Sequence, residues 1–187
     1  MVFNIVVVYG SVREKREGIK AAKFFMNKLK ERGHNSILID PIEYKLPFIA
    51  KTFKEYGTKA PESLKELSSL LKNADGYIVV TAEYNHNIPP ALTNLMSYFG
   101  EEYSRKPAGI VSYSNGPFAG VRAAIQLREF LSAIGIVSIP NVFPVSKVQS
   151  SFDENGNVLD ENYNRRVKTF LEEFEWYVRA LKREREL

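Results

Sequence analysis

The sequence predicts an α/β protein in which a parallel five-stranded sheet is covered by helices on both faces. Short apolar runs alternate along the chain with segments in which apolar residues recur every three or four positions, as expected of strands and helices in such a sheet. The length of 187 residues suits one domain with a full core. Since no repeat or low-complexity segment interrupts the pattern, we expect a single doubly wound domain over residues 1–187.

The elements follow one another in a regular order. The expected strands are residues 2–9, 36–40, 76–81, 107–113 and 136–140. Helical spacing of apolar residues between and after them predicts helices around residues 19–29, 64–74, 121–134 and 163–181, of which the last has the clearest apolar face. Two segments fall outside this rhythm: residues 41–60 form a long connection, and residues 146–160 are typical of a turn or short hairpin.

Composition excludes several kinds of function. The chain has no cysteine, so it forms no disulfide or thiolate metal site, and its two histidines are too few for a multi-histidine metal centre. The net charge of +4 is spread along the chain, and the C-terminal tail mixes both signs, so nucleic-acid binding is not expected. No apolar run approaches the roughly 20 residues that span a bilayer, and we therefore expect a cytoplasmic protein without a membrane partner.

The predicted fold also indicates where a ligand would bind. In a doubly wound sheet, ligands bind beyond the carboxyl ends of the strands, where the winding direction reverses. The loops after the first, third and fourth expected strands are therefore the candidates.

The first of these loops, residues 10–18, has the composition of an anion site. Gly10 permits a tight turn, and the helix that begins near residue 17 or 18 directs free amide groups and its positive dipole end into the loop. Ser11 adds a hydroxyl, and Arg13 and Arg16 add forked donors that match phosphate oxygens. The alternative is a surface turn whose arginines pair with neighbouring glutamates.

The same loop excludes two common nucleotide sites. It lacks the Gly-Lys-Ser/Thr sequence of a nucleoside triphosphate loop, and Val12 stands where a dinucleotide loop needs glycine. Asp40 could imitate the ribose-binding acid of a dinucleotide fold, but before Pro41 it is better interpreted as a turn-starting residue. A single phosphate monoester fits the remaining geometry best.

The second loop, residues 81–90, places an aromatic side chain among polar ones at a strand's carboxyl end. Its backbone could bind the polar edge of a flat heterocycle while Tyr84 packs nearby. The alternative is a polar turn in which Asn85 and Asn87 hydrogen-bond locally. A general acid or base role for His86 is not favoured, because no partner is identified.

The third loop, residues 112–120, offers small polar groups and flexible backbone. Ser114 and Asn115 supply hydrogen-bonding side chains, and Gly116 allows a close approach. Arg122 is expected in the first turn of the following helix, either exposed or paired with a neighbouring loop. The three loops together predict an anion clamp at one end of a site and a place for a planar ring at the other.

Three motifs in these loops resemble those of one enzyme family. Residues 10–18 look like a Gly-Ser-x-Arg phosphate loop, residues 83–92 like a Pro-Glu-Tyr-Asn loop, and residues 120–128 like a Gly-x-Arg-x-x-x-Gln-Leu-Arg helix start. Over most of residues 3–140 the chain thus resembles the NADPH-dependent FMN reductase family, the flavodoxin-like quinone, azo and chromate reductases. The resemblance implies a flavodoxin-like three-layer sandwich with strand order 2-1-3-4-5.

The resemblance further implies FMN as the cofactor and NADPH or NADH as co-substrate, with no metal and no side chain that acts as a proton-transfer catalyst. The residues it places at the cofactor are Ser11, Arg13, Arg16, Gly18 and Ile19 at the phosphate, Ala82, Glu83, Tyr84 and Asn85 beside the isoalloxazine, and Ser114, Asn115 and Gly116 on the third side. The implied acceptor is a small molecule such as a quinone, azo compound, metal oxyanion or free flavin.

The resemblance also implies a homodimer or homotetramer joined through the helix after the second loop, which would place Asn94 and Tyr98 against a partner subunit. Three positions depart from the family pattern. Ala82 replaces a common proline, Thr93 replaces a frequent lysine, and residues 115–118 replace a more glycine-rich stretch. These departures concern the ring environment and the interface more than flavin binding itself.

Two alternatives of other classes stay open at this point. One is a flavodoxin-type electron carrier, although such proteins have a hydroxyl-rich phosphate loop and an acidic surface, whereas this loop holds arginines and the chain carries a charge of +4. The other is a flavin-dependent regulatory or interaction module that uses residues 41–60 or the basic tail for contacts.

Overall fold

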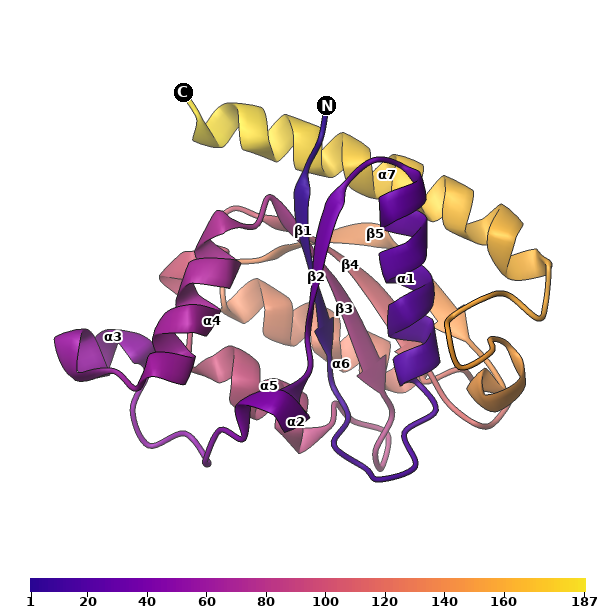
Figure 1. Cartoon of the computed structure of the whole chain (residues 1–187), viewed down its shortest axis with the longest axis horizontal. Helices are drawn as coiled ribbons and strands as arrows, with labels where there is room; N and C mark the ends of the chain where they lie inside the picture. The colour runs from indigo at the N-terminus through magenta and orange to yellow at the C-terminus, as the bar shows by residue number, and fades with distance from the viewer.

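A five-stranded sheet of parallel strands forms the centre of the protein in the computed structural model, which describes all 187 residues (Figure 1). Its strands are β1 (Asn4–Tyr9), β2 (Asn35–Ile39), β3 (Gly76–Ala82), β4 (Pro107–Tyr113) and β5 (Val137–Val145). Every neighbouring pair is parallel, and the order is β2-β1-β3-β4-β5. The predicted fold class and strand order are therefore confirmed.

Helices cover both faces of the sheet. One face carries α1 (Ile19–Glu31) and α7 (Asn162–Arg185), and the other carries α4 (Glu62–Asn73), α5 (Pro90–Ser97) and α6 (Val121–Ala133) (Figure 1). Each face has its own apolar core, because successive residues of a strand point to opposite sides. In β1, for example, Val7 and Tyr9 belong to the core under α1, while Val6 and Val8 belong to the core under α4.

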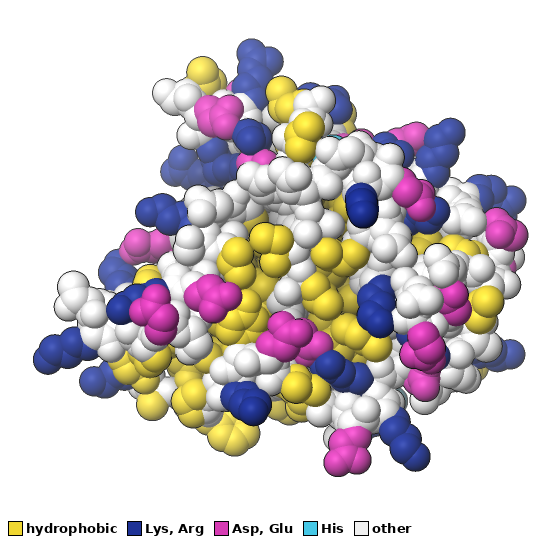
Figure 2. All heavy atoms as spheres, viewed as in Figure 1, with side chains coloured by type: hydrophobic (Ala, Val, Ile, Leu, Met, Phe, Trp, Pro, Cys, Tyr) yellow, Lys and Arg dark blue, Asp and Glu magenta, His cyan; other side chains and the backbone are white.

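The central and edge strands differ in exposure. All residues of β3 and β4 are buried, which explains their continuous apolar runs. The edge strand β2 alternates instead, and its Ile37 is exposed. Seen from this edge, hydrophobic side chains gather over the middle of the molecule (Figure 2).

The fifth strand is longer than predicted. It continues past residue 140 to Val145, through Pro140 and Pro144. The prolines argue against a longer strand in the sequence, because proline has no backbone N–H to donate to a neighbouring strand. However, β5 pairs only with β4 and is an edge strand, where a missing backbone N–H is tolerated. The extension matters because it brings residues 145–150 next to the loop after β4.

The two irregular segments contain short elements. Residues 41–60 hold α2 (Pro41–Tyr44), α3 (Phe53–Tyr56) and the 3₁₀ turn η1 (Gly57–Lys59). Two further 3₁₀ turns are η2 (Glu101–Tyr103) and η3 (Val148–Ser150). An isolated antiparallel bridge between Phe152 and Val158 confirms the short hairpin expected within residues 146–160.

The three candidate loops share one end of the sheet. Loop one (residues 10–18), loop two (residues 83–89) and loop three (residues 114–120) follow β1, β3 and β4, while the two chain termini lie at the opposite end (Figure 1). No helix has both the length and the apolar character needed to cross a membrane.

Candidate functional site

The ends of β1, β3 and β4 bring the three loops into contact. Ala82, the last residue of β3, pairs with Tyr113, the last residue of β4, and Tyr9 of β1 pairs two positions lower on β3. Across this edge the Ser11 hydroxyl lies 2.5 Å from the Tyr84 hydroxyl, and so loops one and two touch directly. The structure thus confirms that the loops meet at one site.

All predicted site residues lie at this edge. They are Ser11, Arg13, Arg16, Gly18 and Ile19 in loop one and at the start of α1, Ala82, Glu83, Tyr84 and Asn85 at the end of β3 and in loop two, and Ser114, Asn115 and Gly116 in loop three.

Loop one is pressed against the sheet and α5. The Gly10 amide donates to the Val80 carbonyl over 3.0 Å. A Cβ at position 10 would lie 2.9 Å from Leu92 Cδ2 and 3.2 Å from that same carbonyl oxygen, closer than side chains normally approach. Glycine is therefore required here for packing, in agreement with the tight turn expected from the sequence.

The start of α1 has no side-chain cap, and its Ile19 and Lys20 amides donate only to the Arg16 and Glu17 carbonyls of loop one, over 3.4 and 3.2 Å. Its N-cap, Gly18, gives no side-chain hydrogen bond, and the first turn of α1 contains no acidic residue. The first amides of a helix carry the positive end of its dipole and need acceptors. Ser11, only 2% exposed, adds its hydroxyl at the same place. The local charge therefore favours an anion.

The two loop arginines have different surroundings. Arg16 donates to the Asp40 carboxylate over 2.5 Å and to the Ser11 carbonyl over 3.1 Å. The hydrogen bond to Asp40 raises the pKa of Arg16. Asp40 also accepts from the Ile42 amide as the N-cap of α2, which confirms its turn-starting role. The Arg13 guanidinium instead lies 4.0 Å from the centre of the Tyr84 ring and forms no ion pair.

Loop two is a tight hairpin. Tyr84 and Asn87 exchange both backbone hydrogen bonds at 3.0 Å, and the two residues between them, Asn85 and His86, have φ values of 52° and 64°. This is the pattern of a type I′ turn, which favours asparagine. His86 is exposed at its tip and makes no side-chain hydrogen bond, in keeping with the sequence reading that gave it no acid–base role.

An ion pair couples loops two and three. The Glu83 carboxylate accepts from the Arg122 backbone amide over 3.1 Å and from its guanidinium over 3.3 Å. Of the two expectations for Arg122, the pairing with a neighbouring loop is confirmed. Because Arg122 is in the first turn of α6, this contact fixes the turn of loop two relative to the helix that follows loop three.

Loop three is supported by residues that the sequence did not single out. The Ser114 amide donates to Val145, the Val148 amide donates back to Ser114, and the Lys147 amide donates to Gly116, each over 3.2 Å. The strand prediction stopped at residue 140 and so gave no reason to place residues 145–148 here. The apolar residues Val142, Phe143 and Val145 past Pro140 were the signal that could have found them.

Sequence reasoning also missed two buried tyrosines beneath the loops. The hydroxyl groups of Tyr9 and Tyr113 lie 2.9 Å apart, on the side of the sheet covered by α1. Burial raises the pKa of Tyr9 to about 12. In the sequence both residues look like ordinary apolar strand positions. Their place as the last residues of strands that lead into candidate loops was the available signal.

The donor set fits a phosphate monoester joined to a planar ring. Loop one offers a hydroxyl, a guanidinium without a carboxylate partner and helix amides, all of which are donors suited to phosphate oxygens. Loops two and three offer backbone and small polar groups a short way along the same edge. A doubly wound sheet of order 2-1-3-4-5 with such an edge defines a mononucleotide-binding protein of the flavodoxin-like class.

Comparison with known proteins identifies the family. Residues 3–150 match the NADPH-dependent FMN reductase family, and the chain therefore belongs to it. A 2-hydroxy-1,4-benzoquinone reductase of Burkholderia sp is 25% identical, with 96% of this chain and 98% of that protein covered. The chain is thus an NAD(P)H-dependent oxidoreductase of the FMN reductase and quinone reductase type, with FMN as its cofactor.

Solved structures agree on the fold. FerB, a flavoenzyme NAD(P)H:(acceptor) oxidoreductase from Paracoccus denitrificans, superimposes with a TM-score of 0.76 at 22% identity, covering 97% of this chain and 98% of that one. A flavodoxin from Pseudomonas aeruginosa gives a TM-score of 0.56 at 13% identity, covering 94% and 99%. The flavodoxin-like fold is therefore confirmed, while the role of each site residue stays a prediction.

Proposed function

We propose that this protein transfers two electrons as a hydride from NADPH or NADH through bound FMN to a small acceptor, namely a quinone, an azo compound, a metal oxyanion or a free flavin. The observation that carries the proposal is the joining of an anion-binding loop to two polar loops at one sheet edge, through the Ser11–Tyr84 and Glu83–Arg122 contacts. Bound FMN supplies the redox chemistry, and the protein supplies binding and orientation.

In loop one we assign the two arginines distinct tasks. Arg13 has no carboxylate partner and is the guanidinium free to meet a phosphate. Arg16 already pairs with Asp40 and holds the Ser11 carbonyl, so it acts mainly by fixing the shape of the loop while adding positive charge. Ser11, Gly18 and Ile19 complete the proposed phosphate contacts.

The ring would lie across loops two and three. We assign the ring contacts to residues 82–85 and to residues 114–116, because both segments are held rigidly by backbone hydrogen bonds or by the Glu83–Arg122 pair. Rigid backbone groups position a ring without reorganisation. None of the assigned side chains is given a proton-transfer role, in keeping with the exposed, unpaired position of His86.

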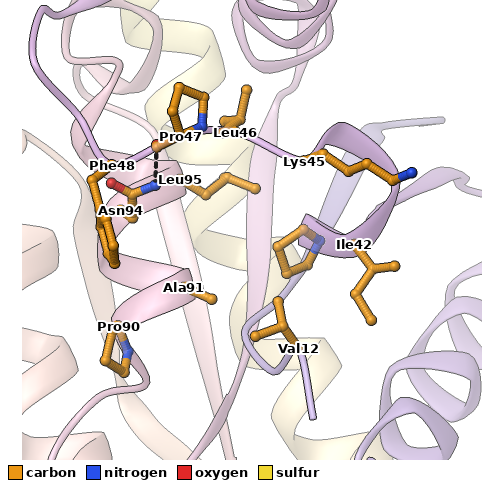
Figure 3. Close-up of a pocket in the computed structure, with 11 residues that line it drawn as sticks. Val12, Ile42, Lys45, Leu46, Pro47, Phe48, Pro90, Ala91, Asn94 and Leu95 are labelled. Carbon is orange, nitrogen blue, oxygen red and sulfur yellow. Dashed lines mark hydrogen bonds between the residues drawn. The ribbon is translucent and has the colours of Figure 1, made fainter. Parts of the chain in front are cut away.

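We place contact with a second copy of the chain at an apolar groove of about 540 Å³ beside loop one, between α2 and α5 (Figure 3). Val12, Ile42 and Phe48 line it, and Phe48 is 86% exposed. An exposed aromatic on such a groove is typical of an interface. The Phe48→Ser variant is expected to shift the oligomer towards monomer in light scattering, whereas Trp176→Ser, an exposed aromatic on α7, is expected to leave it unchanged.

The structure corrects part of the interface expectation. Tyr98 is only 1% exposed and donates to the Pro47 carbonyl of its own chain, so it does not face a partner. Asn94 lines the groove, but its amide group binds the neighbouring segment, donating to Pro47 over 2.8 Å and accepting from the Ile49 amide over 2.9 Å. Asn94 thus forms part of the groove wall, and Tyr98 helps to hold Pro47 of the overlying segment in place.

An anaerobic titration tests the proposed function. Protein loaded with FMN should lose its flavin absorbance on addition of stoichiometric NADPH or NADH and regain it when a quinone is added. Absence of nicotinamide oxidation with every acceptor class would contradict the proposal. Stepwise one-electron reduction by dithionite without nicotinamide oxidation would favour an electron carrier, and partner binding that depends on flavin reduction would favour a regulatory module.

A further inference from the structure

Two tyrosines form a buried pair directly beneath loop one. Tyr9 and Tyr113 end β1 and β4, and their rings stack nearly parallel, at 15°, with centres 6.2 Å apart. Their hydroxyl oxygens are 2.9 Å apart, and the side chains belong to residues that are 0% and 6% exposed. Two phenols in the core need hydrogen-bond partners, because burying hydroxyl groups is unfavourable unless they are hydrogen-bonded.

The Tyr113 ring lies against the start of α1. A Cβ at Gly18 would lie 1.9 Å from Tyr113 Cζ, the carbon that carries the hydroxyl group. Position 18 must therefore be glycine, because the hydroxyl end of this phenol occupies the space next to it. The phenol is thereby held at the positive end of the α1 dipole, where the phosphate is expected.

Both phenols keep their protons at neutral pH. Burial raises the pKa of Tyr9 to about 12 and the pKa of Tyr113 well above its ordinary value, while interaction with the Ser11 hydroxyl opposes part of both effects. The two groups therefore serve as hydrogen-bond donors at neutral pH. The Ser11 and Tyr84 hydroxyls form a second hydrogen-bonded pair in loops one and two, 2.5 Å apart.

The Tyr9–Tyr113 pair has more protons than internal links. Each hydroxyl contributes one proton and the pair contains one link, so one proton of the pair lacks a partner within it. The same count holds for the separate Ser11–Tyr84 pair. A further donor, the Arg16 guanidinium, lies over the Tyr9 ring. A ligand oxygen at this place would supply the acceptor for the remaining proton.

We propose that Tyr113 donates its hydroxyl group to an oxygen of the FMN phosphate and that Tyr9 is a positioning residue, orienting Tyr113 and Ser11. The inference rests on FMN binding by this family member and not on the identity of the electron acceptor. The proposal adds the Tyr113 hydroxyl, which lies beneath loop one, to a phosphate site otherwise built from loop one alone.

Comparison of FMN with riboflavin isolates the phosphate contact. Apoprotein is titrated with each flavin, and binding is measured by quenching of flavin fluorescence. Tyr113→Phe is expected to weaken FMN binding by about tenfold and leave riboflavin binding unchanged, because only a hydrogen bond to a charged group is lost. Tyr9→Phe should weaken FMN binding by about threefold, again without an effect on riboflavin. Tyr103→Phe is the control, since its hydroxyl is buried without a partner near the start of β4.

Two results would overturn the proposal: unchanged FMN affinity in Tyr113→Phe, or equal losses for FMN and riboflavin, which would indicate a structural role only. The phosphorus NMR shift of bound FMN provides a second readout, and it should change in Tyr113→Phe but not in Tyr103→Phe. If wild-type protein binds FMN but lacks turnover, the proposed function fails while this inference is still tested.

Discussion

The two ends of the sheet differ in whether their hydrogen-bond donors have acceptors within the chain. At the amino ends of the strands, the Lys106 amine donates to the carbonyls of Leu71 and Lys72 over 2.8 and 2.6 Å, which closes the C-terminus of α4. The Tyr77 hydroxyl donates to Leu71 over 2.8 Å, and Lys182 pairs with Asp75 at 2.9 Å. These three donors have acceptors within the chain, and they serve stability.

At the carboxyl ends, several donors lack a matching acceptor within the chain. The Arg13 guanidinium has no carboxylate partner, and the Tyr9–Tyr113 and Ser11–Tyr84 pairs each have one proton more than their internal link uses. A folded chain tolerates such an imbalance where a ligand supplies the acceptors. The comparison teaches that donors without acceptors, rather than the number of polar residues, distinguish the end of the sheet at which we propose that FMN binds.

The largest expected effect comes from removing the charge of loop one. The double substitution Arg13→Ala and Arg16→Ala should weaken FMN binding at least about a hundredfold, because the charge-assisted contact of Arg13 is lost together with the loop shape and positive charge that Arg16 supplies. Fluorescence titration of apoprotein measures the affinity. Lys15→Ala is the control, since this exposed residue of the same loop is expected to face water. Unchanged FMN affinity in the double variant would refute the phosphate assignment.

Removing a donor at the amino end should give the opposite profile. Lys106→Met deprives two helix-terminal carbonyls of their partner and is expected to lower the free energy of unfolding by about 2 kcal/mol. Urea unfolding of the apoprotein measures this loss. FMN affinity should be unchanged, and a parallel fall in affinity would mean that the two ends are not independent.

The same lysine predicts a dependence of stability on pH. Burial, followed by the nearby Arg185 charge, lowers the pKa of Lys106 to about 8 in the folded protein, below its ordinary value of 10.5. Between these values the unfolded chain binds more protons than the folded one, so the free energy of unfolding should rise with pH above about 8. The neutral amine still has two hydrogens for its two carbonyl partners.

Comparison with Lys106→Met isolates this contribution. The stability difference between wild type and variant should grow by on the order of 1 kcal/mol between pH 7.5 and pH 10, once screening by solvent is allowed for. Urea unfolding at a series of pH values provides the measurement. A constant difference across this range would show that Lys106 does not change its charge there.

The sequence predicted the fold because the pattern of burial is local. Runs such as β3 and β4 are buried on both sides, and only a covered parallel sheet explains them. The meeting of the three loops followed from the same topology, and the loop contacts of Ser11 and Arg122 confirm it. Periodicity and strand order are thus sufficient to bring the candidate loops to one edge of the sheet.

What the sequence could not supply was pairing between distant residues. The partnership of Arg16 with Asp40 joins positions far apart in the chain, and so does the contact between Tyr9 and Tyr113. A tyrosine in a buried strand fits the same sequence pattern as an apolar residue. The partner of its hydroxyl group is set by tertiary packing and cannot be read from that pattern. The difference between Arg13 and Arg16 was invisible for the same reason.

The smallest expected effect comes from breaking the link between loops two and three. This prediction tests whether phosphate contacts and ring contacts lie in separate loops. The Glu83–Arg122 pair is partly exposed at Arg122, and exposed ion pairs contribute about 0–1 kcal/mol. Arg122→Ala should therefore weaken FMN and riboflavin binding equally, by no more than about threefold, because it loosens the ring loops and leaves loop one intact. Fluorescence titration with both flavins measures this ratio. A loss confined to FMN would place Arg122 at the phosphate instead and would move the boundary between the two halves of the site.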